Sequence, residues 1–289
     1  MTRRLIITAD DYGMCASVND AIEECLSAAS VRATCAMVNM PLFNATAALR
    51  QKFSDCSVGI HWTLTQGRPV LPAAQLPTLC RPDGEFHSVL EFRHRWMRGR
   101  INGGEIKNEL KAQCRRFSQV AGMPDFWNTH QNSHVLPRLF DLFVLVGQEL
   151  GIPAMRSHRR LTVPYKISPL RHNLGHPLYW FKGQVIARWA AKAAAGGVLM
   201  PDGRVYTPGY DGAGIASLPE IVERIEWNSV RKAVEVVVHP ATMVEEGLFG
   251  SLKQSRLLEY SVLRDPSFKE QLYRRGVEVA SFASLRPTS

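Results

Sequence analysis

The chain has 289 residues, of which 45% are apolar and 21% are charged, a composition typical of soluble globular proteins. It contains no apolar run of about 18 residues, so the sequence predicts no transmembrane helix. The net charge of +9 is spread over several arginine clusters without a helix-turn-helix, zinc-finger or RNA-binding signature, so nucleic acid is not an expected partner.

Apolar runs rich in β-branched residues alternate with amphipathic stretches along the chain. Ser17 and Asp20 stand at capping-box spacing and predict the start of the first helix. The predicted strands span residues 4–9, 33–39, 57–64, 125–130, 154–158, 233–240 and 277–282. The predicted helices span residues 17–29, 44–53, 104–122, 137–151, 218–227 and 255–276, and an amphipathic helical pattern covers 176–194.

This alternation predicts a parallel sheet covered by helices. About seven such units in one chain favour an α/β fold, a distorted or incomplete TIM-like (β/α) barrel with mostly parallel strands. We therefore expect residues 1–289 to form one domain, with segments 65–104 and 165–215 as excursions around the mouth of the barrel.

Acidic and histidine side chains recur where predicted strands end. The carboxyl ends of parallel strands in α/β folds meet at one mouth, so these groups are expected to converge despite their separation in sequence. They are Asp10 and Asp11 in "TADDYG", His61 in "GIHWTLT", His130 and His134 in "THQNSH", and His239 in "VEVVVHP".

One carboxylate and two imidazoles form a ligand set suited to Zn²⁺ and usable by other divalent ions such as Mg²⁺. Three protein ligands leave coordination positions open for water and substrate, which is the catalytic arrangement. A second carboxylate next to the first could accept a proton from the activated water. The adjacent Asp10 and Asp11 are therefore interpreted as one base and one metal ligand.

Five stretches, in this order, resemble the YdjC/ChbG/HpnK-like carbohydrate deacetylase family. They are "TADDYG" (8–13), "GIHWTLTQGRPV" (59–70), "THQNSH" (129–134), "GIPAMRSHR" (151–159) and "VEVVVHPA" (234–241). The resemblance covers nearly the whole chain and implies a distorted TIM-like barrel with one divalent metal ion. It also implies removal of N-acetyl groups from amino sugars, either free oligosaccharides or sugars linked to a polyprenyl phosphate.

Carried over to this sequence, the resemblance implies that Asp11, His61 and His134 bind the metal. It implies further that Asp10 is the general base and that His239 protonates the leaving amine.

The resemblance also implies that His130 lines the site as a further catalytic candidate and that Arg156 holds an oxygen-rich or anionic part of the substrate. Asn132, a further candidate substrate contact, stands where the family usually has Asp, so a negative charge is missing there although hydrogen bonding is retained. Trp62 is a candidate sugar-stacking residue, and Tyr210, in the Gly-rich "TPGYDGAG", is a further candidate substrate contact.

The sequence thus predicts a metal-dependent carbohydrate N-deacetylase, a hydrolase of C–N bonds other than peptide bonds that releases acetate. A non-catalytic sugar-binding protein on the same fold is the alternative. The start of the chain lacks a signal-peptide pattern and its six cysteines are scattered, so we expect a cytoplasmic protein with reduced thiols. The basic, aromatic stretch 176–194 suggests peripheral contact with the inner face of a membrane or with a lipid-linked sugar, or else a packing or homodimer contact.

Overall fold

A curled sheet of seven strands forms the centre of the computed structural model, which describes residues 2–161, 177–205, 213–249 and 252–286. The strand order is β4-β3-β2-β1-β6-β5, and β7 pairs with the N-terminal half of β1. All pairings between these strands are parallel. The strands are β1 (Arg3–Tyr12), β2 (Ala33–Ala36), β3 (Ser57–Trp62), β4 (Trp127–Thr129), β5 (Gly203–Arg204), β6 (Val234–Val238) and β7 (Val277–Ala280).

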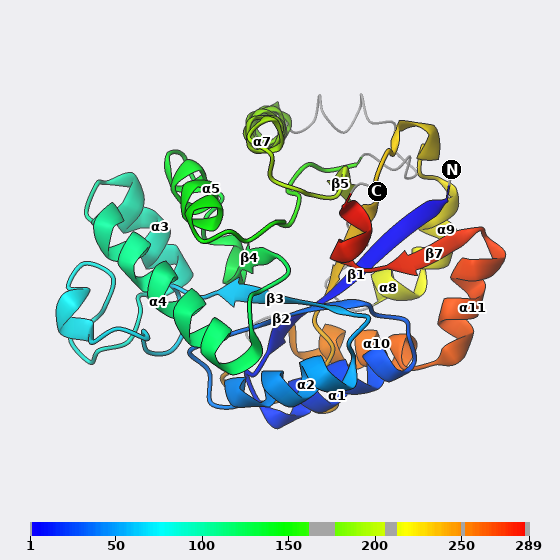
Figure 1. Cartoon of the computed structure of the whole chain (residues 1–289), viewed down its shortest axis with the longest axis horizontal. Coiled ribbons are helices and arrows are strands. Elements are labelled where there is room, and N and C mark those ends of the chain that lie inside the picture. The colour runs from blue at the N-terminus through cyan, green and yellow to red at the C-terminus, as the bar shows by residue number, and fades with distance from the viewer. Residues whose placement is uncertain (1, 162–176, 206–212, 250–251, 287–289) are drawn as a thin grey trace.

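The helices lie around the outside of the curled sheet (Figure 1). The α-helices are α1 (Ala16–Ser27), α2 (Thr46–Lys52), α3 (Val89–Met97), α4 (Gly103–Ala121), α5 (Leu139–Glu149), α7 (Pro177–Ala195), α8 (Ala213–Ala216), α9 (Leu218–Glu223), α10 (Lys253–Leu263) and α11 (Pro266–Arg274). Short 3₁₀ turns are η1 (Phe43–Ala45), η2 (Ala73–Gln75), η3 (His130–Asn132), η4 (Trp227–Ser229) and η6 (Phe282–Leu285).

Strand β1 separates two kinds of buried surface, because successive side chains of a strand point to opposite faces. Leu5, Ile7 and Ala9 belong to the large apolar core between the sheet and the helices. Ile6 belongs instead to a small cluster on the concave side of the sheet, and Asp10 continues that inward face toward the carboxyl end of the strand. The fold is therefore an incomplete TIM-like α/β barrel, as the sequence predicted.

The concave side of the sheet is apolar at one end and polar at the other. Phe126 and Phe282 stack there with ring centroids 3.8 Å apart, among small side chains such as Ala33 and Ala154. Beyond this apolar layer the interior carries hydrogen-bonded polar groups, beginning with Glu235, which accepts from the Thr8 hydroxyl at 2.9 Å. The apolar layer fills the amino-terminal end of the sheet and leaves the carboxyl ends of the strands for polar chemistry.

Three local expectations from the sequence were wrong in detail. Helix α1 begins at Ala16 after Cys15, which makes no side-chain cap, so Ser17 lies inside the first turn and forms no capping box. The predicted helix 255–276 is two helices, because Asp265 caps a new helix and Pro266 starts it. The predicted strand 154–158 contributes only isolated bridges, and the two-residue strand β5 was not predicted at all.

Helix α7 covers most of the stretch for which a membrane or dimer contact was considered. Phe181 is 62% exposed, whereas Trp189 stacks on Phe140 of α5 with ring centroids 5.4 Å apart. None of the helices in the described part of the chain combines the length and apolar composition that a bilayer crossing requires. The membrane contact itself stays a prediction.

Gly59 of β3 offers a test of the apolar layer. A Cβ at this position would lie 2.7 Å from ring atoms of Phe126, which is already stacked on Phe282. We expect Gly59→Ala to lower the free energy of unfolding by about 1–3 kcal/mol through overpacking, measured by urea denaturation. The control is Gly183→Ala in α7, where a Cβ meets nothing within 4 Å. Equal stability of the two variants would contradict this description of the interior.

Candidate active site

The two adjacent carboxylates at the end of β1 both point into the mouth of the curled sheet. In a regular strand they would point to opposite faces, but Asp11 has a left-handed backbone with φ +74°. The register with β2 also shifts between Ala9 and Tyr12. The strand thus ends in a local distortion that directs Asp10 and Asp11 to the same side, and aspartate tolerates such a backbone better than most residues.

Asp10 is held by an arginine. Its two carboxylate oxygens accept from Nη1 and Nη2 of Arg156 at 2.7 and 2.6 Å, and Arg156 Nε donates to Glu235 at 3.0 Å. Burial by itself would raise the pKa of Asp10, but the neighbouring Arg156 charge lowers it well below its usual range. Asp10 is therefore a buried, permanently ionised carboxylate at neutral pH.

Asp11 has a different arginine. Its Oδ2 accepts from Nη2 of Arg256, which reaches in from α10 and lies over the Phe249 ring at 4.4 Å. Burial opposes ionisation of Asp11, but the Arg256 charge holds its pKa well below the ordinary value. This pairing leaves Oδ1 of Asp11 facing two histidines.

The two histidines next to Asp11 each turn one ring nitrogen toward it. His61 Nε2 lies 3.3 Å and His130 Nδ1 3.1 Å from Asp11 Oδ1, and these two nitrogens are 3.3 Å apart. The opposite nitrogens face side-chain amide oxygens, His61 Nδ1 at 2.5 Å from Asn128 and His130 Nε2 at 2.7 Å from Gln66. Because an amide oxygen only accepts, it places the proton on the outer nitrogen and leaves both inner nitrogens as lone pairs.

In the neutral form of both rings, three electron-pair donors therefore meet at one point. The ligand atoms of Asp11, His61 and His130 all lie within 4.8 Å of one another, and all three residues are buried. Burial by itself would lower the pKa of His61, but Asp10 and Asp11 raise it well above its ordinary value, so in the protein alone Nε2 carries a proton that a bound cation would displace. One carboxylate oxygen and two imidazole nitrogens are a donor set that fits a divalent cation such as Zn²⁺.

A second group of metal-ligand types, Asp10, Cys35 and His61, lies on the other side of the His61 ring. Its atoms are already engaged: Cys35 donates to Asp10 at 3.1 Å, and His61 Nδ1 bonds Asn128. Burial raises the pKa of the Cys35 thiol to about 11, so it remains protonated at neutral pH. These hydrogen bonds hold the side chains of His61 and Asp10 in place, so we do not interpret this group as a second metal site.

The structure brings His130, and not His134, to Asp11 and His61. Gln131 and Asn132 adopt left-handed backbone conformations with φ +55° and +49°, and the chain turns away after His130. His134 is fully buried, and its Nδ1 forms a hydrogen bond of 2.6 Å with the Thr129 hydroxyl. Its ring packs on Phe140 with ring centroids 5.6 Å apart. The resemblance implied His134 as the third metal ligand, whereas the geometry favours His130 in its place.

His239, after β6, lies close to Asp10 and Asp11. Its Nε2 is 3.8 Å from Asp10 Oδ2, its side chain is 28% exposed, and its backbone N–H donates to Glu259 at 2.5 Å. Burial lowers the pKa of His239 to about 4, and burial raises that of Glu259 to about 7. His239 is therefore a neutral imidazole at pH 7, next to Asp10 and in contact with solvent.

The residues expected to touch substrate have mixed positions. Arg156 is 2% exposed and engaged with Asp10 and Glu235, so it positions the carboxylates and does not face open space. Trp62 is fully buried against Trp127, with ring centroids 5.1 Å apart, and presents no face for a sugar. Asn132 is half-buried in the left-handed turn, and Tyr210 lies outside the described residues.

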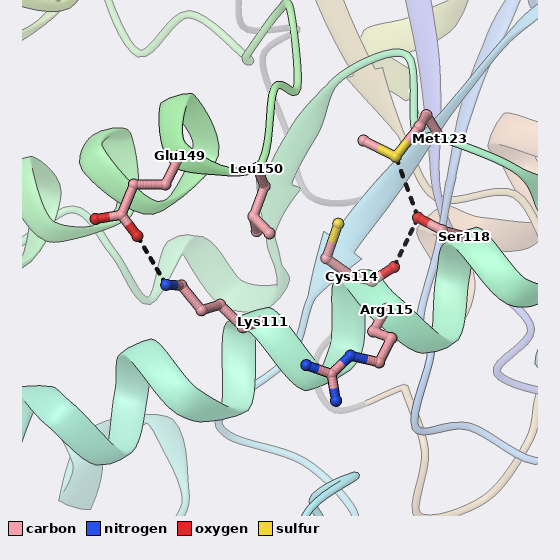
Figure 2. Close-up of a pocket in the computed structure, with 7 residues that line it drawn as sticks. All are labelled: Lys111, Cys114, Arg115, Ser118, Met123, Glu149 and Leu150. Carbon is pink, nitrogen blue, oxygen red and sulfur yellow. Dashed lines mark hydrogen bonds and ion pairs between the residues drawn. The ribbon is translucent and has the colours of Figure 1, made fainter.

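A surface groove of about 490 Å³ lies elsewhere, between α4 and the end of α5 (Figure 2). Lys111 and Glu149 form an ion pair of 2.8 Å across it, and Ser118 bonds the Met123 sulfur at 3.3 Å. None of the polar side chains at the strand ends lines this groove. The candidate site is therefore defined by the convergence of side chains and not by this groove.

Comparison with known proteins gives the same family as the sequence motifs. A family model described as YdjC-like protein matches residues 4–274. The chain belongs to the YdjC-like family. Chitooligosaccharide deacetylases of Yersinia pestis and Yersinia pseudotuberculosis are each 26% identical to this YdjC-like chain over 288 residues, covering 98% of it and 99% of the relative.

Among solved structures, a protein of *Enterococcus faecalis* V583, provisionally named a cellobiose-phosphate cleavage protein, has the same fold as this YdjC-like chain. The TM-score is 0.72 at 23% identity, and the match covers 99% of this chain and 100% of the other. The incomplete barrel is thus shared over its whole length.

Sequence reasoning missed several residues that hold the site of this YdjC-like protein. Asn128 had a usable signal, because it directly precedes "TH" at the end of a predicted strand. Glu235 had a weaker one, as a lone carboxylate within the apolar run "VEVVV". Arg256 and Gln66 had none, since each is one polar residue among many in a helix or a loop.

Removal of Arg156 from its pair with Asp10 is expected to lower the stability of the protein by an amount that depends on pH. A carboxylate whose pKa is lowered by folding stabilises the protein above the ordinary pKa of about 4, and this contribution is lost as pH falls below it. Arg156→Met leaves Asp10 buried without its cation, so we expect a loss of about 3–5 kcal/mol at pH 7. The loss should shrink toward pH 3, measured by urea denaturation at several pH values. The control is Arg159→Met, at an exposed arginine three residues away, and a pH-independent difference would contradict this account.

The positions of His130 and His134 predict that only the His130 substitution weakens zinc binding. His130→Ala removes a nitrogen that would bind the metal directly. Loss of a residue that only hydrogen-bonds a ligand costs about 10–100-fold in metal affinity, so zinc affinity should fall by more than that here. His134→Phe keeps a ring among Phe140 and Phe143 and should leave zinc affinity within a few-fold of wild type. Isothermal titration with zinc measures both, with circular dichroism as the folding control. Zinc binding lost in the His134 variant and retained in the His130 variant would reverse the assignment.

Proposed function

We propose that this protein is a metal-dependent hydrolase that removes the N-acetyl group from an amino sugar and releases acetate. The observation that carries the proposal is the set of three inward-facing electron-pair donors from Asp11, His61 and His130, next to the ionised Asp10. Relatives that match 98% of the chain are chitooligosaccharide deacetylases, which supports an acetylated amino sugar as substrate.

Asp11, His61 and His130 hold the metal ion in this proposal, with Zn²⁺ as the first choice and Mg²⁺ or another divalent ion as alternatives. A divalent cation in this position supplies Lewis-acid polarisation of the acetamide carbonyl and lowers the pKa of water. Asn128 and Gln66 keep the two imidazoles in the tautomers that binding requires.

Asp10 and His239 handle the protons. Asp10 is ionised and can accept the proton of the attacking water, while Arg156 fixes the orientation of its carboxylate. His239, partly exposed and 3.8 Å from Asp10, takes up the proton that Asp10 has accepted and passes it to the amide nitrogen, which leaves only when protonated. The products are acetate and a free amine.

The finer features of the substrate belong to the same proposal. Chitooligosaccharides are the first candidates, and a sugar carried by a lipid phosphate is the second. Exposed Phe181, Lys182 and Arg188 on α7 support the idea of peripheral contact with an anionic membrane surface from the cytoplasmic side.

The proposal is tested by acetate release. Zinc-loaded protein is incubated with chitobiose to chitopentaose, and acetate and free amine are measured together. We expect the two products in equal amounts, and His239→Gln should lower kcat by about 10²–10⁴-fold without changing zinc affinity. The matched control is His94→Gln, at an exposed histidine on α3.

One outcome would overturn the proposed activity, and another would overturn the role of His239. Zinc-loaded wild-type protein that binds acetylated oligosaccharides without releasing acetate would favour the sugar-binding alternative. Undiminished acetate release by the His239 variant would remove His239 from the proton pathway.

A further inference from the structure

Gln66 lies in the segment that connects β3 to α3 and reaches back to the metal-ligand cluster. Its Oε1 is 2.7 Å from Nε2 of His130, on the far side of the ring from Asp11. The amide oxygen accepts the Nε2 proton, so Nδ1 of His130 remains a lone pair facing Asp11 and His61. The position of Gln66 therefore decides which nitrogen of His130 is available and how the ring is oriented.

The backbone around Gln66 is fixed by a tight turn. Asn39 Nδ2 donates to the carbonyl oxygens of Gln66 and Arg68 at 2.9 and 3.0 Å. Gly67 between them has φ +71°, and a Cβ there would lie 3.2 Å from Met40 Cε and 3.3 Å from Asn39 Nδ2. The turn is thus closely packed against the 39–40 segment.

Helix α4 holds the chain on both sides of this turn. Gln113 accepts from the Thr63 N–H at 3.1 Å and donates to the Thr63 carbonyl at 2.8 Å, three residues before Gln66. Glu109 accepts from the backbone N–H groups of Val70 and Leu71 at 2.8 and 3.0 Å, beyond Gln66.

The Glu109 and Gln113 side chains are fully buried and are joined by a hydrogen bond of 2.9 Å. A carboxylate buried without such donors would be strongly destabilising. Its place under two consecutive N–H groups indicates that α4 holds this segment rigidly.

We propose that Gln66 is a positioning residue for His130 and that the Glu109–Gln113 pair of α4 sets the position of Gln66. The inference rests on the proposed function only in taking His130 as a metal ligand. It adds a route by which a helix outside the site determines the affinity and the geometry of the metal centre.

The first experiment compares three variants by titration with zinc alone and by the visible absorption spectrum of the cobalt-substituted protein. Gln66→Met removes the acceptor at similar size, so zinc affinity should fall about 10–100-fold and the cobalt spectrum should change. Gln66→Glu restores an acceptor oxygen and should return both readouts close to wild type, while its added buried charge lowers the stability of the metal-free protein. Gln75→Met, at an exposed residue of the same segment, is the control and should match wild type.

The second experiment tests the coupling from α4. Glu109→Gln replaces one acceptor oxygen by an NH₂ group that faces a backbone N–H, so the segment should loosen and zinc affinity should fall. If Glu109 acts through Gln66, the same change should have no additional effect on zinc affinity in the Gln66→Met background. Additive losses would mean that Glu109 acts by another route and would overturn that half of the inference.

The outcomes separate this inference from the proposed function. Wild-type protein that binds neither zinc nor cobalt would overturn the metal site and the proposed function with it. Wild-type protein that binds zinc with unchanged affinity and cobalt spectrum in Gln66→Met would overturn the role of Gln66 and leave the proposed function standing. Thermal unfolding of the metal-free variants checks that the zinc effect is not a general loss of structure.

Discussion

Two adjacent buried carboxylates at the end of β1 are the constraint on which the rest of the site depends. Asp10 and Asp11 would repel each other and oppose burial, and an unpaired buried charge is among the most destabilising features a protein can carry. Each carboxylate has its own arginine: Arg156 forms a bidentate pair with Asp10, and Arg256 pairs with the outer oxygen of Asp11. The arginines come from distant parts of the chain, one beyond β4 and one from α10. Folding of the complete sheet and its outer helices is therefore required before β1 can end in this way.

The incomplete barrel provides the space for these pairs. A closed barrel fills its interior with layers of branched side chains, whereas here the apolar filling is confined to one end, around the Phe126–Phe282 stack. Small side chains along the concave side, Ala33 and Gly59 among them, leave room for the two rings. Above this layer Glu235, Arg156 and Asp10 follow one another as hydrogen-bonded partners toward the carboxyl end of the sheet. The order of these layers places the buried charges at the carboxyl ends of the strands.

The fold and most of the site could be predicted because both follow from strand periodicity. Parallel strands put their carboxyl ends together, so acids and histidines that end strands were expected to meet, and Asp11, His61 and His130 do. The choice between His130 and His134 could not be made in this way, because it depends on two left-handed residues, Gln131 and Asn132, that reverse the chain. Neither is glycine, and Asn132, although asparagine adopts this backbone more readily than most residues, was too weak a signal alone to mark the turn. Arg256 was missed for another reason: a single arginine on a mostly polar helix carries no signal of the carboxylate that it contacts.

The outer contacts of the two imidazoles are neutral amides, and the charges around them suggest why. Asp10, Asp11 and Glu235 bring three carboxyl groups into the interior, and Arg156, Arg256 and Arg204 bring guanidinium groups near them. Arg256 pairs with Asp11 at Oδ2, and Oδ1 of Asp11 faces the two imidazoles. A divalent cation there would balance the charge of Oδ1, whereas further carboxylates behind His61 and His130 would add buried negative charge that needs its own compensation. Asn128 and Gln66 orient the rings without that cost, because an amide oxygen accepts a proton and carries no net charge.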